Sequence, residues 1–412
     1  MPEYFDNLET RDPELRERAA FAAVRTQIAH AKANAPAFRS VLAAVDPASI
    51  LDRSALAHVP VTRKSELLLR QQVERPFGGF SASGWGAAAR VFASPGPIYE
   101  PEGRRPDYWR LARALFAAGF RPGDLVHNTF AYHFTPAGSM LESGAHALGC
   151  TVFPGGTGQT EMQVQAMADL KPAGYVGTPS FLRIILDKAD ELGVPLPFLR
   201  KALVSGEAFL PVLRNNLRTR RIAGYQVYAT ADLGTIAYES EAHDGLIVDE
   251  GVLVELVRPG TGDPVAPGEV GEVVVTTLFN GDYPLVRFGT GDLSAALPGA
   301  STCGRTNMRI KGWMGRADQT TKVKGLFVHP SQIAEVIKRY PQIARARLVV
   351  DNPDGNDRMS LHVEMSGEDS VLTDAVKASL RDVTKLRSEV VVRAIGELPN
   401  DGKVIDDVRK LD

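Results

Sequence analysis

The N-terminal part of the chain has the hydrophobic spacing of a helix. Between residues 13 and 44, apolar side chains such as Leu15 and Ile28 recur at helical intervals, and Pro36 interrupts the pattern. Beyond about residue 105, helix-like stretches alternate with short strand-like runs, which is typical of βα units around a mostly parallel sheet. We therefore predict a helical lead-in followed by an α/β region. The alternating stretches are 108–119, 124–130, 138–148, 151–153, 161–170, 174–176, 180–193 and 201–204.

Two later segments depart from this alternation. Within residues 245–279, the strand-like runs 252–257 and 272–278 flank a stretch rich in glycine and proline, a pattern that favours antiparallel strands. After Gly315 the order becomes strand, helix, two strands, helix and strand, which predicts a compact α+β domain. The elements predicted there are 322–328, 331–339, 344–350, 359–365, 371–383 and 389–394.

Together these patterns predict an α/β protein of two domains. Residues 1–317 would form a large domain of mixed or parallel sheets with helices and a β-rich subdomain. Residues 318–412 would form a small, mobile α+β domain. A chain of 412 residues is long enough for such a division, because domains commonly contain about 100–200 residues.

Composition narrows the functional classes. With 47 basic and 49 acidic residues the formal net charge is -2, so we expect no nucleic-acid partner and no membrane surface as partner. The two cysteines, Cys150 and Cys303, cannot build a disulfide framework or an all-cysteine zinc site, and they favour a reducing compartment. The chain begins without the pattern of a signal peptide and contains no run of about 18 apolar residues. We therefore expect a cytoplasmic protein.

Several catalytic signatures are missing from the sequence. It contains no Gly-x-Ser-x-Gly elbow, no Walker phosphate loop and no His-Glu-x-x-His zinc motif. The loop at 155–158, Gly-Gly-Thr-Gly, lacks the third glycine of a dinucleotide-binding turn. The eight histidines show no spacing typical of metal ligands. Hydrolases of the elbow type, Walker-type nucleotidases and such zinc proteases are therefore excluded.

Short polar loops follow many of the predicted strands. In an α/β sheet such loops meet at the carboxyl ends of the strands, where ligands bind. Each loop is a weak signal alone, and their order along the chain is the informative feature. The loops are 93–96, 204–207, 228–232, 287–292, 315–318 and 398–403.

In this order the loops resemble those of the adenylate-forming superfamily, and most closely its phenylacetate-CoA ligase branch, over about residues 15–412. The similar phrases include Arg-Pro-Gly-Asp-Leu-Val-His-Asn at 121–128 and Gly-Thr-Pro-Ser at 177–180. They continue with Thr-Gly-Asp at 290–292, Gly-Arg-Ala-Asp at 315–318 and a late Gly-Lys at 402–403. The resemblance implies an enzymatic activity that joins a carboxylate to ATP, giving an acyl adenylate, and then passes the acyl group to a thiol.

The resemblance also implies roles for individual residues. Lys403 would bridge the carboxylate and the α-phosphate, and Asp232 would hold Mg²⁺. Asp292 would accept hydrogen bonds from the ribose hydroxyls, with Arg316 close to the ribose and the phosphate. Asp318 would be the hinge of a domain rotation. Further residues implied at the nucleotide are Ser94, Gly96, Ser205, Gly206, Glu207, Tyr228, Ala229 and Thr230, and those implied at the acyl group are Tyr132, His133 and Phe134.

Each of these residue types also has an ordinary structural role. Lys403 could be a solvated surface lysine, and Asp292 could close a turn through its side chain. Asp232 could equally be a helix cap, and it is shorter than the glutamate usual at that place in the family. Arg316 could pair with a neighbouring acid, and Tyr132 could belong to the core.

The chain departs from the family at the phosphate loop. The family has approximately Ser-Ser-Gly-Thr-Thr-Gly-Lys-Pro, whereas residues 94–101 read Ser-Pro-Gly-Pro-Ile-Tyr-Glu-Pro. Prolines remove amide donors, the lysine is missing, and Glu100 adds a negative charge, so we expect pyrophosphate to be held poorly. Ala229 and Ala231 replace the usual glycine and hydroxyl residue of the adenine loop. We also expect no structural zinc, because Ser240, His243 and Cys303 cannot rebuild the small metal cluster of some relatives.

Two functional hypotheses follow. The first is an ATP-dependent ligase that activates a carboxylic acid, with an aromatic acid as one option, and transfers it to a thiol such as coenzyme A, using ATP and Mg²⁺. The second is a non-catalytic or redirected relative that binds an acyl adenylate, acyl-CoA or small carboxylate without ATP-driven adenylation. The sequence determines neither the acid nor the acceptor thiol. A homodimer is an expectation from the resemblance alone.

Overall fold

The computed structural model describes residues 3–94, 97–317, 321–323, 326–352, 357–367, 369–401 and 403–409. Contacts divide the chain into two compact units. The first contains residues 1–254, 275–288 and 297–312, and the second contains 255–274, 289–296 and 313–412. The predicted boundary between 317 and 318 stays a prediction, because Asp318 lies outside the described residues.

The first unit begins with the predicted helices. Helix α1 (Pro13–Asn34) starts at Asp12, whose carboxylate accepts hydrogen bonds from the backbone amides of Glu14 and Leu15. The backbone of Ala35 is extended, which ends α1, and Pro36 begins the second helix, α2 (Pro36–Val41). The next elements are η1 (Pro47–Ser49), α3 (Arg53–Ala57), β1 (Thr62–Arg63) and α4 (Lys64–Val73).

The centre of the first unit is a mixed sheet whose strands run in the order β5-β4-β6-β7-β8-β9-β10-β14. Its parallel strands are β4 (Leu125–Asn128), β5 (Thr151–Pro154), β6 (Gly174–Gly177), β7 (Lys201–Val204) and β8 (Ala223–Thr230). Its antiparallel strands are β9 (Gly234–Glu239), β10 (Leu246–Val248) and β14 (Arg309–Ile310). The predicted βα alternation is therefore confirmed.

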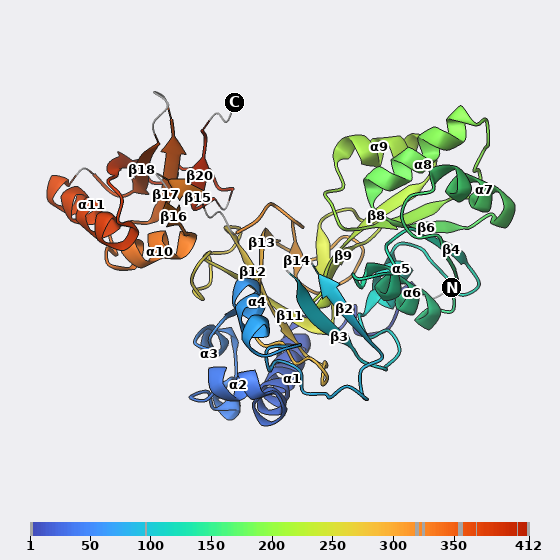
Figure 1. Ribbon diagram of the computed structural model, residues 1–412, viewed down its shortest axis with the longest axis horizontal. Coiled ribbons are helices and arrows are strands. Elements are labelled where there is room, and N and C mark those ends of the chain that lie inside the picture. The colour runs from blue at the N-terminus through green and yellow to red at the C-terminus, as the bar shows by residue number, and fades with distance from the viewer. Residues whose placement is uncertain are drawn as a thin grey trace. The chain divides into compact units, whose positions relative to one another are not determined.

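Helices cover both faces of this sheet. Successive strand residues point to opposite faces, so Tyr175 packs with one helical layer and Val176 with the other. Figure 1 shows α8 and α9 on one side of β6 and β8, and α5 and α6 on the other. The helices are α5 (Leu111–Ala117), α6 (Ala137–Ala147), α7 (Thr160–Leu170), α8 (Pro179–Glu191) and α9 (Pro211–Thr219).

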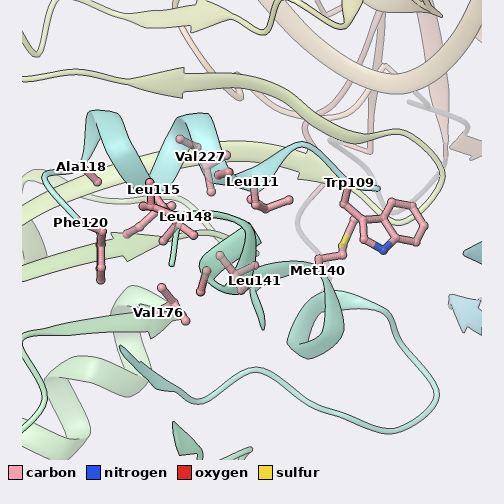
Figure 2. Packing of buried hydrophobic residues seen from close by; sticks show 14 of the residues in the cluster. Trp109, Leu111, Leu115, Ala118, Phe120, Met140, Leu141, Leu148, Val176 and Val227 are labelled. Atoms are coloured by element: carbon pink, nitrogen blue, oxygen red, sulfur yellow. The ribbon is translucent and has the colours of Figure 1, made fainter. Parts of the chain in front are cut away.

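The layer of α5 and α6 contains a core of large apolar side chains. Leu115, Phe120, Leu141 and Val227 are buried there together with Trp109 (Figure 2). Burying one such side chain stabilises the fold by about 1.5–3 kcal/mol before the entropy of ordering is subtracted. This core fixes the strands whose carboxyl ends carry the polar loops.

A separate hairpin precedes this layer. Strands β2 (Arg90–Ser94) and β3 (Ile98–Glu102) pair antiparallel, with Ser94 opposite Ile98. The connection between these two paired residues therefore comprises residues 95–97. The hairpin corresponds to the altered phosphate loop of the sequence.

The second unit contains the predicted α+β elements. Its four-stranded sheet has the order β19-β18-β17-β20, and two helices, α10 and α11, accompany it. The predicted strand 322–328 is wrong as one element, because β15 and β16 form an antiparallel pair there. Strand β20 was not predicted. The elements are β15 (Thr321–Val323), β16 (Leu326–Val328), α10 (Pro330–Lys338), β17 (Arg345–Asp351), β18 (Arg358–Glu364), α11 (Ser370–Thr384), β19 (Glu389–Arg393) and β20 (Ile405–Asp407).

Three further strands contribute residues to both units. They are β11 (Val252–Val257), β12 (Val270–Thr277) and β13 (Phe288–Leu297), and the first two confirm the predicted β-rich segment. Among the described residues, no helix has the length and apolar character needed to cross a bilayer.

Candidate active site

Two neighbouring parallel strands of the first unit end at the same edge of the sheet. Strand β7 leads into Ser205, Gly206 and Glu207, and β8 ends with Tyr228, Ala229 and Thr230. The hydroxyl of Ser205 donates to the carbonyl of Val227 at 2.8 Å, which joins the two strand ends. These six predicted nucleotide residues therefore lie at the carboxyl ends of two adjoining strands, where ligands bind in an α/β sheet.

The start of α8 reaches the same edge. The backbone amide of Ser180 donates to Glu207 Oε1 at 2.6 Å, and the hydroxyl of Thr178 caps the helix by accepting from the amide of Phe181. Glu207 thus connects the loop after β7 to the N-terminus of α8, and Glu207 itself is exposed. The segment at 177–180, singled out in the sequence, is part of this edge.

Asp232 lies in the turn between β8 and β9, and only 1% of its surface is exposed. Its Oδ2 atom is 2.7 Å from the ammonium of Lys64 at the start of α4. A strand follows Asp232, so it caps no helix. Lys64 was missed by the sequence reasoning, since no motif in residues 62–64 marks a lysine as an internal partner.

The remaining carboxylate oxygen of Asp232 is the candidate ligand for the predicted Mg²⁺. Oδ1 is buried and makes no hydrogen bond within the part of the chain that the structure describes. Mg²⁺ is commonly held by one or two carboxylates together with phosphates and water. Asp232 fits that donor set with one oxygen, although Lys64 holds the other. No group of three or more metal-ligating side chains occurs among the described residues.

Within the β2–β3 hairpin, a buried carboxyl group of one strand is hydrogen-bonded to a serine of the other. Glu100 is fully buried; its Oε1 lies 2.6 Å from the hydroxyl of Ser94, and its Oε2 accepts from the Ser94 amide at 3.3 Å. Burial raises the pKa of Glu100 to about 8, and the nearby charge of Asp232 adds to the rise, against the opposing effects of Ser94 and Lys64. The Ser94 donors implied for a phosphate are thus engaged within the hairpin. Gly96 lies outside the described residues.

The predicted acyl residues lie beside this hairpin. The carbonyl of Phe134 accepts from the amide of Ala93 at 2.7 Å, while 78% of Phe134 is exposed and His133 is exposed as well. The hydroxyl of Tyr132 accepts from Asn128 Nδ2 at 2.8 Å. Burial, followed by the charge and hydrogen bond of Glu142, raises the pKa of Tyr132. Tyr132 is half-buried, so it is not a residue of the closed core.

In the second unit, Asp292 and Arg316 are partners. Arg316 NH1 lies 2.8 Å from Asp292 Oδ1, and the two residues also form an antiparallel backbone bridge. The indole of Trp313 donates to the same carboxylate oxygen at 3.2 Å. Gly291 has a φ of +74°, and a Cβ there would meet the Arg316 guanidinium at 2.7 Å. The two residues that the resemblance assigned to the ribose are therefore brought together.

Lys403 also belongs to the second unit. Its ammonium lies 2.8 Å from Asp406 Oδ1, and 49% of its side chain is exposed. Its neighbour Gly402 and the predicted hinge Asp318 lie outside the described residues. A half-exposed lysine is available to a ligand once it leaves its carboxylate partner.

Two family models match the chain. Residues 108–279 match the model described as AMP-binding enzyme, and residues 325–408 match the AMP-binding enzyme C-terminal domain. The first match contains the strand-end loops and Asp232, and the second contains Lys403.

Curated relatives match over most of their length. The phenylacetate-coenzyme A ligase of Thermus thermophilus is 31% identical over 381 residues, covering 88% of this chain and 84% of that protein. The phenylacetate-coenzyme A ligase of Pseudomonas putida is 30% identical and covers 88% of this chain and 85% of that protein. The Escherichia coli protein of the same name is 28% identical over 97% of this chain and 95% of that protein.

A solved structure has the same fold. The open conformation of 2-hydroxyisobutyryl-CoA ligase, in complex with 2-HIB-AMP and CoA, superposes with a TM-score of 0.74 and 24% identity, covering 97% of this chain and 92% of that one. At this identity the likeness concerns the fold, which agrees with the predicted α/β architecture and its separate C-terminal α+β elements.

Proposed function

Because the chain belongs to the AMP-binding enzyme family, on the branch of the phenylacetate-coenzyme A ligases, we propose that it activates a carboxylic acid with ATP and transfers the acyl group to coenzyme A. The main support for this proposal is that the chain is similar to acid–CoA ligases along nearly its whole length and not only at one motif. It is an acid–thiol ligase that works through an acyl adenylate.

The reaction has two balanced steps. A carboxylate oxygen attacks the α-phosphorus of ATP, forming the mixed anhydride acyl-AMP while pyrophosphate leaves. The thiolate of coenzyme A then attacks the acyl carbon, forming the thioester while AMP leaves with the electron pair of the broken C–O bond. Both steps concentrate negative charge near the α-phosphate, so a cation and fixed hydrogen-bond donors stabilise their transition states.

The proposed residue roles follow from this chemistry. Lys403 supplies the cation at the α-phosphate and the acid. Asp292, held by Arg316, accepts the ribose hydroxyls, and the loops after β7 and β8 surround the adenine. The support is the sequence resemblance and the pairing of Asp292 with Arg316. Asp318 remains the proposed hinge.

Mg²⁺ is the proposed metal. It would be held by the free oxygen of Asp232 together with the phosphates, and when bound it would neutralise phosphate charge. Lys64 fixes the other oxygen of Asp232, which keeps that carboxylate aligned at the end of β8.

The proposed acid is aromatic. The named relatives act on phenylacetate, and the exposed Phe134 with Tyr132 offers aromatic contacts beside the hairpin. We further propose a cytoplasmic location, which the scarcity of cysteine favours, and a homodimer, which rests on the family resemblance alone.

A specific observation favours a second function. Glu100 engages both donors of Ser94, so Ser94 offers no donor to the β- and γ-phosphates. A protein that binds an acyl adenylate or a small carboxylate without making the adenylate would need no such donors.

The two functions are separated by one experiment. The protein is incubated with ATP, Mg²⁺ and a panel of acids that includes phenylacetate, benzoate and 2-hydroxyisobutyrate, and hydroxylamine traps the activated acid. Calorimetry with ATP and with AMP runs in parallel. Hydroxamate formation that Lys403→Ala abolishes supports the ligase. Binding of AMP without binding of ATP and without hydroxamate from any acid supports the second function instead.

A further inference from the structure

The loop that carries Lys403 is fixed by two arginines of one strand. Arg345 of β17 donates to the carbonyls of Leu398 and Pro399 at 3.1 and 3.0 Å. Arg347, two residues further along β17, donates to Pro399 at 3.0 Å and pairs with Asp401. The beginning of this loop therefore cannot shift without breaking several charged hydrogen bonds.

Asp406 connects Lys403 to the same arginine. Its Oδ2 atom lies 3.5 Å from Arg347 NH1, and its Oδ1 atom lies 2.8 Å from the Lys403 ammonium. Strand β20 pairs parallel with β17, which places Asp406 opposite Val349. Asp401, in contrast, accepts from the backbone amide of Lys403 at 3.1 Å and does not hold its ammonium. One carboxylate thus holds the lysine side chain, and the other holds its backbone.

The two ends of the Lys403–Asp406 pair differ in freedom. The side chain of Asp406 is 21% exposed and is held by Arg347, which is itself 7% exposed, whereas that of Lys403 is 49% exposed. The carboxylate is the fixed member of the pair and the ammonium is the movable one. An anionic ligand must therefore compete with a carboxylate anchored to a buried guanidinium.

We propose that Asp406 is a positioning residue that holds Lys403 at rest, and that the ammonium leaves it for the phosphate and carboxylate during adenylation. The proposal rests on the proposed function of Lys403. It predicts that Asp406 slows the first step by competition, because the same ammonium cannot serve both anions fully. Partly exposed ion pairs contribute little to stability, so the expected gain on removing the competitor is about two- to fivefold.

The test compares Asp406→Asn with the parent protein at low and high salt. Asparagine keeps an oxygen for Arg347 but removes the charge that holds Lys403. We expect ATP to bind about two- to fivefold more tightly at low salt, and hydroxamate to form faster by a similar factor. Both gains should shrink at about 0.5 M salt, where charges are screened over a few ångströms. Unchanged or weaker ATP binding overturns the proposal.

Two controls separate positioning from loosening of the loop. Asp406→Asn must have no effect on ATP affinity in a Lys403→Ala background, because its effect acts through the lysine. Asp382→Asn, which breaks the more exposed i,i+3 pair between Asp382 and Lys385 on α11, should leave ATP affinity unchanged. A gain that persists without Lys403 overturns the proposal.

The pair itself can be detected without turnover. A water-soluble carbodiimide activates the carboxyl of Asp406, and the amine of Lys403 then forms an amide while the reagent leaves as its urea. We expect mass spectrometry to find this link in the parent protein and not in Asp406→Asn; its absence from the parent overturns the proposal. A parent protein that binds ATP but forms no hydroxamate would refute the proposed ligase, while ATP affinity and the crosslink would still decide the role of Asp406.

Discussion

The ammonium of Lys64 lies 2.7 Å from a carboxylate oxygen of Asp232, a residue that is 168 positions further along the chain. The lysine begins α4 in the N-terminal helical region, and the aspartate ends the βα layer at the turn after β8. The contact ties α4 to the edge of the sheet that carries the loops predicted to bind the nucleotide. It also leaves Asp232 with one oxygen for other partners.

Lys64→Met should destabilise the protein, because it leaves the carboxylate of Asp232 buried without its partner. We expect the free energy of unfolding to fall by about 2 kcal/mol, less than the roughly 3–5 kcal/mol for a fully buried pair, since Lys64 keeps 26% of its side chain exposed. Urea unfolding measures the change. Lys188→Met, which removes an exposed pair with Glu191, serves as the control and should have a much smaller effect. Equal effects of the two substitutions would contradict the buried role of Lys64.

Glu100→Gln should change how stability depends on pH. The pKa of Glu100 rises from 4.5 to about 8 on folding, so the folded protein binds this proton more tightly than the unfolded chain. The associated stability is present below about pH 4.5 and is lost as the pH rises toward 8. The difference in free energy of unfolding between the glutamine variant and the parent should therefore shift in favour of the variant from pH 5 to pH 8. We expect this shift to be on the order of 2 kcal/mol, a value reduced because Asp232 shares in raising the pKa.

The measurement for Glu100 is urea unfolding at several pH values. Glu66→Gln, at an exposed position of α4, provides the matched control. If the Glu100 variant and the parent lose stability in parallel between pH 5 and 8, then Glu100 does not carry the proton. An ordinary surface carboxylate would give that result.

Asp292→Asn should weaken nucleotide binding. The neutral amide accepts ribose hydrogen bonds less strongly than a carboxylate, and it loosens the attachment of Arg316. We expect AMP to bind about tenfold more weakly by calorimetry, since hydrogen bonds to charged groups contribute about 1.5–3 kcal/mol. Thermal unfolding should confirm that the variant folds. Undiminished AMP affinity in a folded variant would exclude Asp292 from the ribose site.

Tyr132→Phe should raise the KM of the acid and leave nucleotide affinity unchanged. The substitution removes the hydroxyl that accepts from Asn128 and leaves the aromatic ring in place. Without the hydrogen bond to Asn128 the ring is held less firmly in the proposed acyl site, so we expect the KM of the acid to rise about three- to tenfold, in line with the roughly 0.5–1.5 kcal/mol of such a bond. Steady-state kinetics with the best acid of the panel tests this expectation, and AMP affinity is the internal control. A change in AMP affinity with an unchanged KM would move Tyr132 out of the acyl site.

Much of the architecture follows from local patterns. The alternation after residue 105 predicted the parallel strands, because a strand buried on both faces, such as that of Tyr175 and Val176, leaves a clear signal as a short apolar run. Local patterns failed where few residues carried the signal. The predicted strand 322–328 is a pair of three-residue strands, and β20 is three residues long.

By itself, the sequence determined the order of the loops, and with it the family and the nucleotide and acyl candidates, since motifs and periodicity are local properties. The tertiary structure alone decided the charge partners. Lys64 meets Asp232, Glu100 closes on Ser94, and Arg347 reaches Asp406 and so fixes the carboxylate that holds Lys403. The physical reason is that a carboxylate selects its cation by distance and burial in the folded chain, and no spacing in the sequence encodes either quantity.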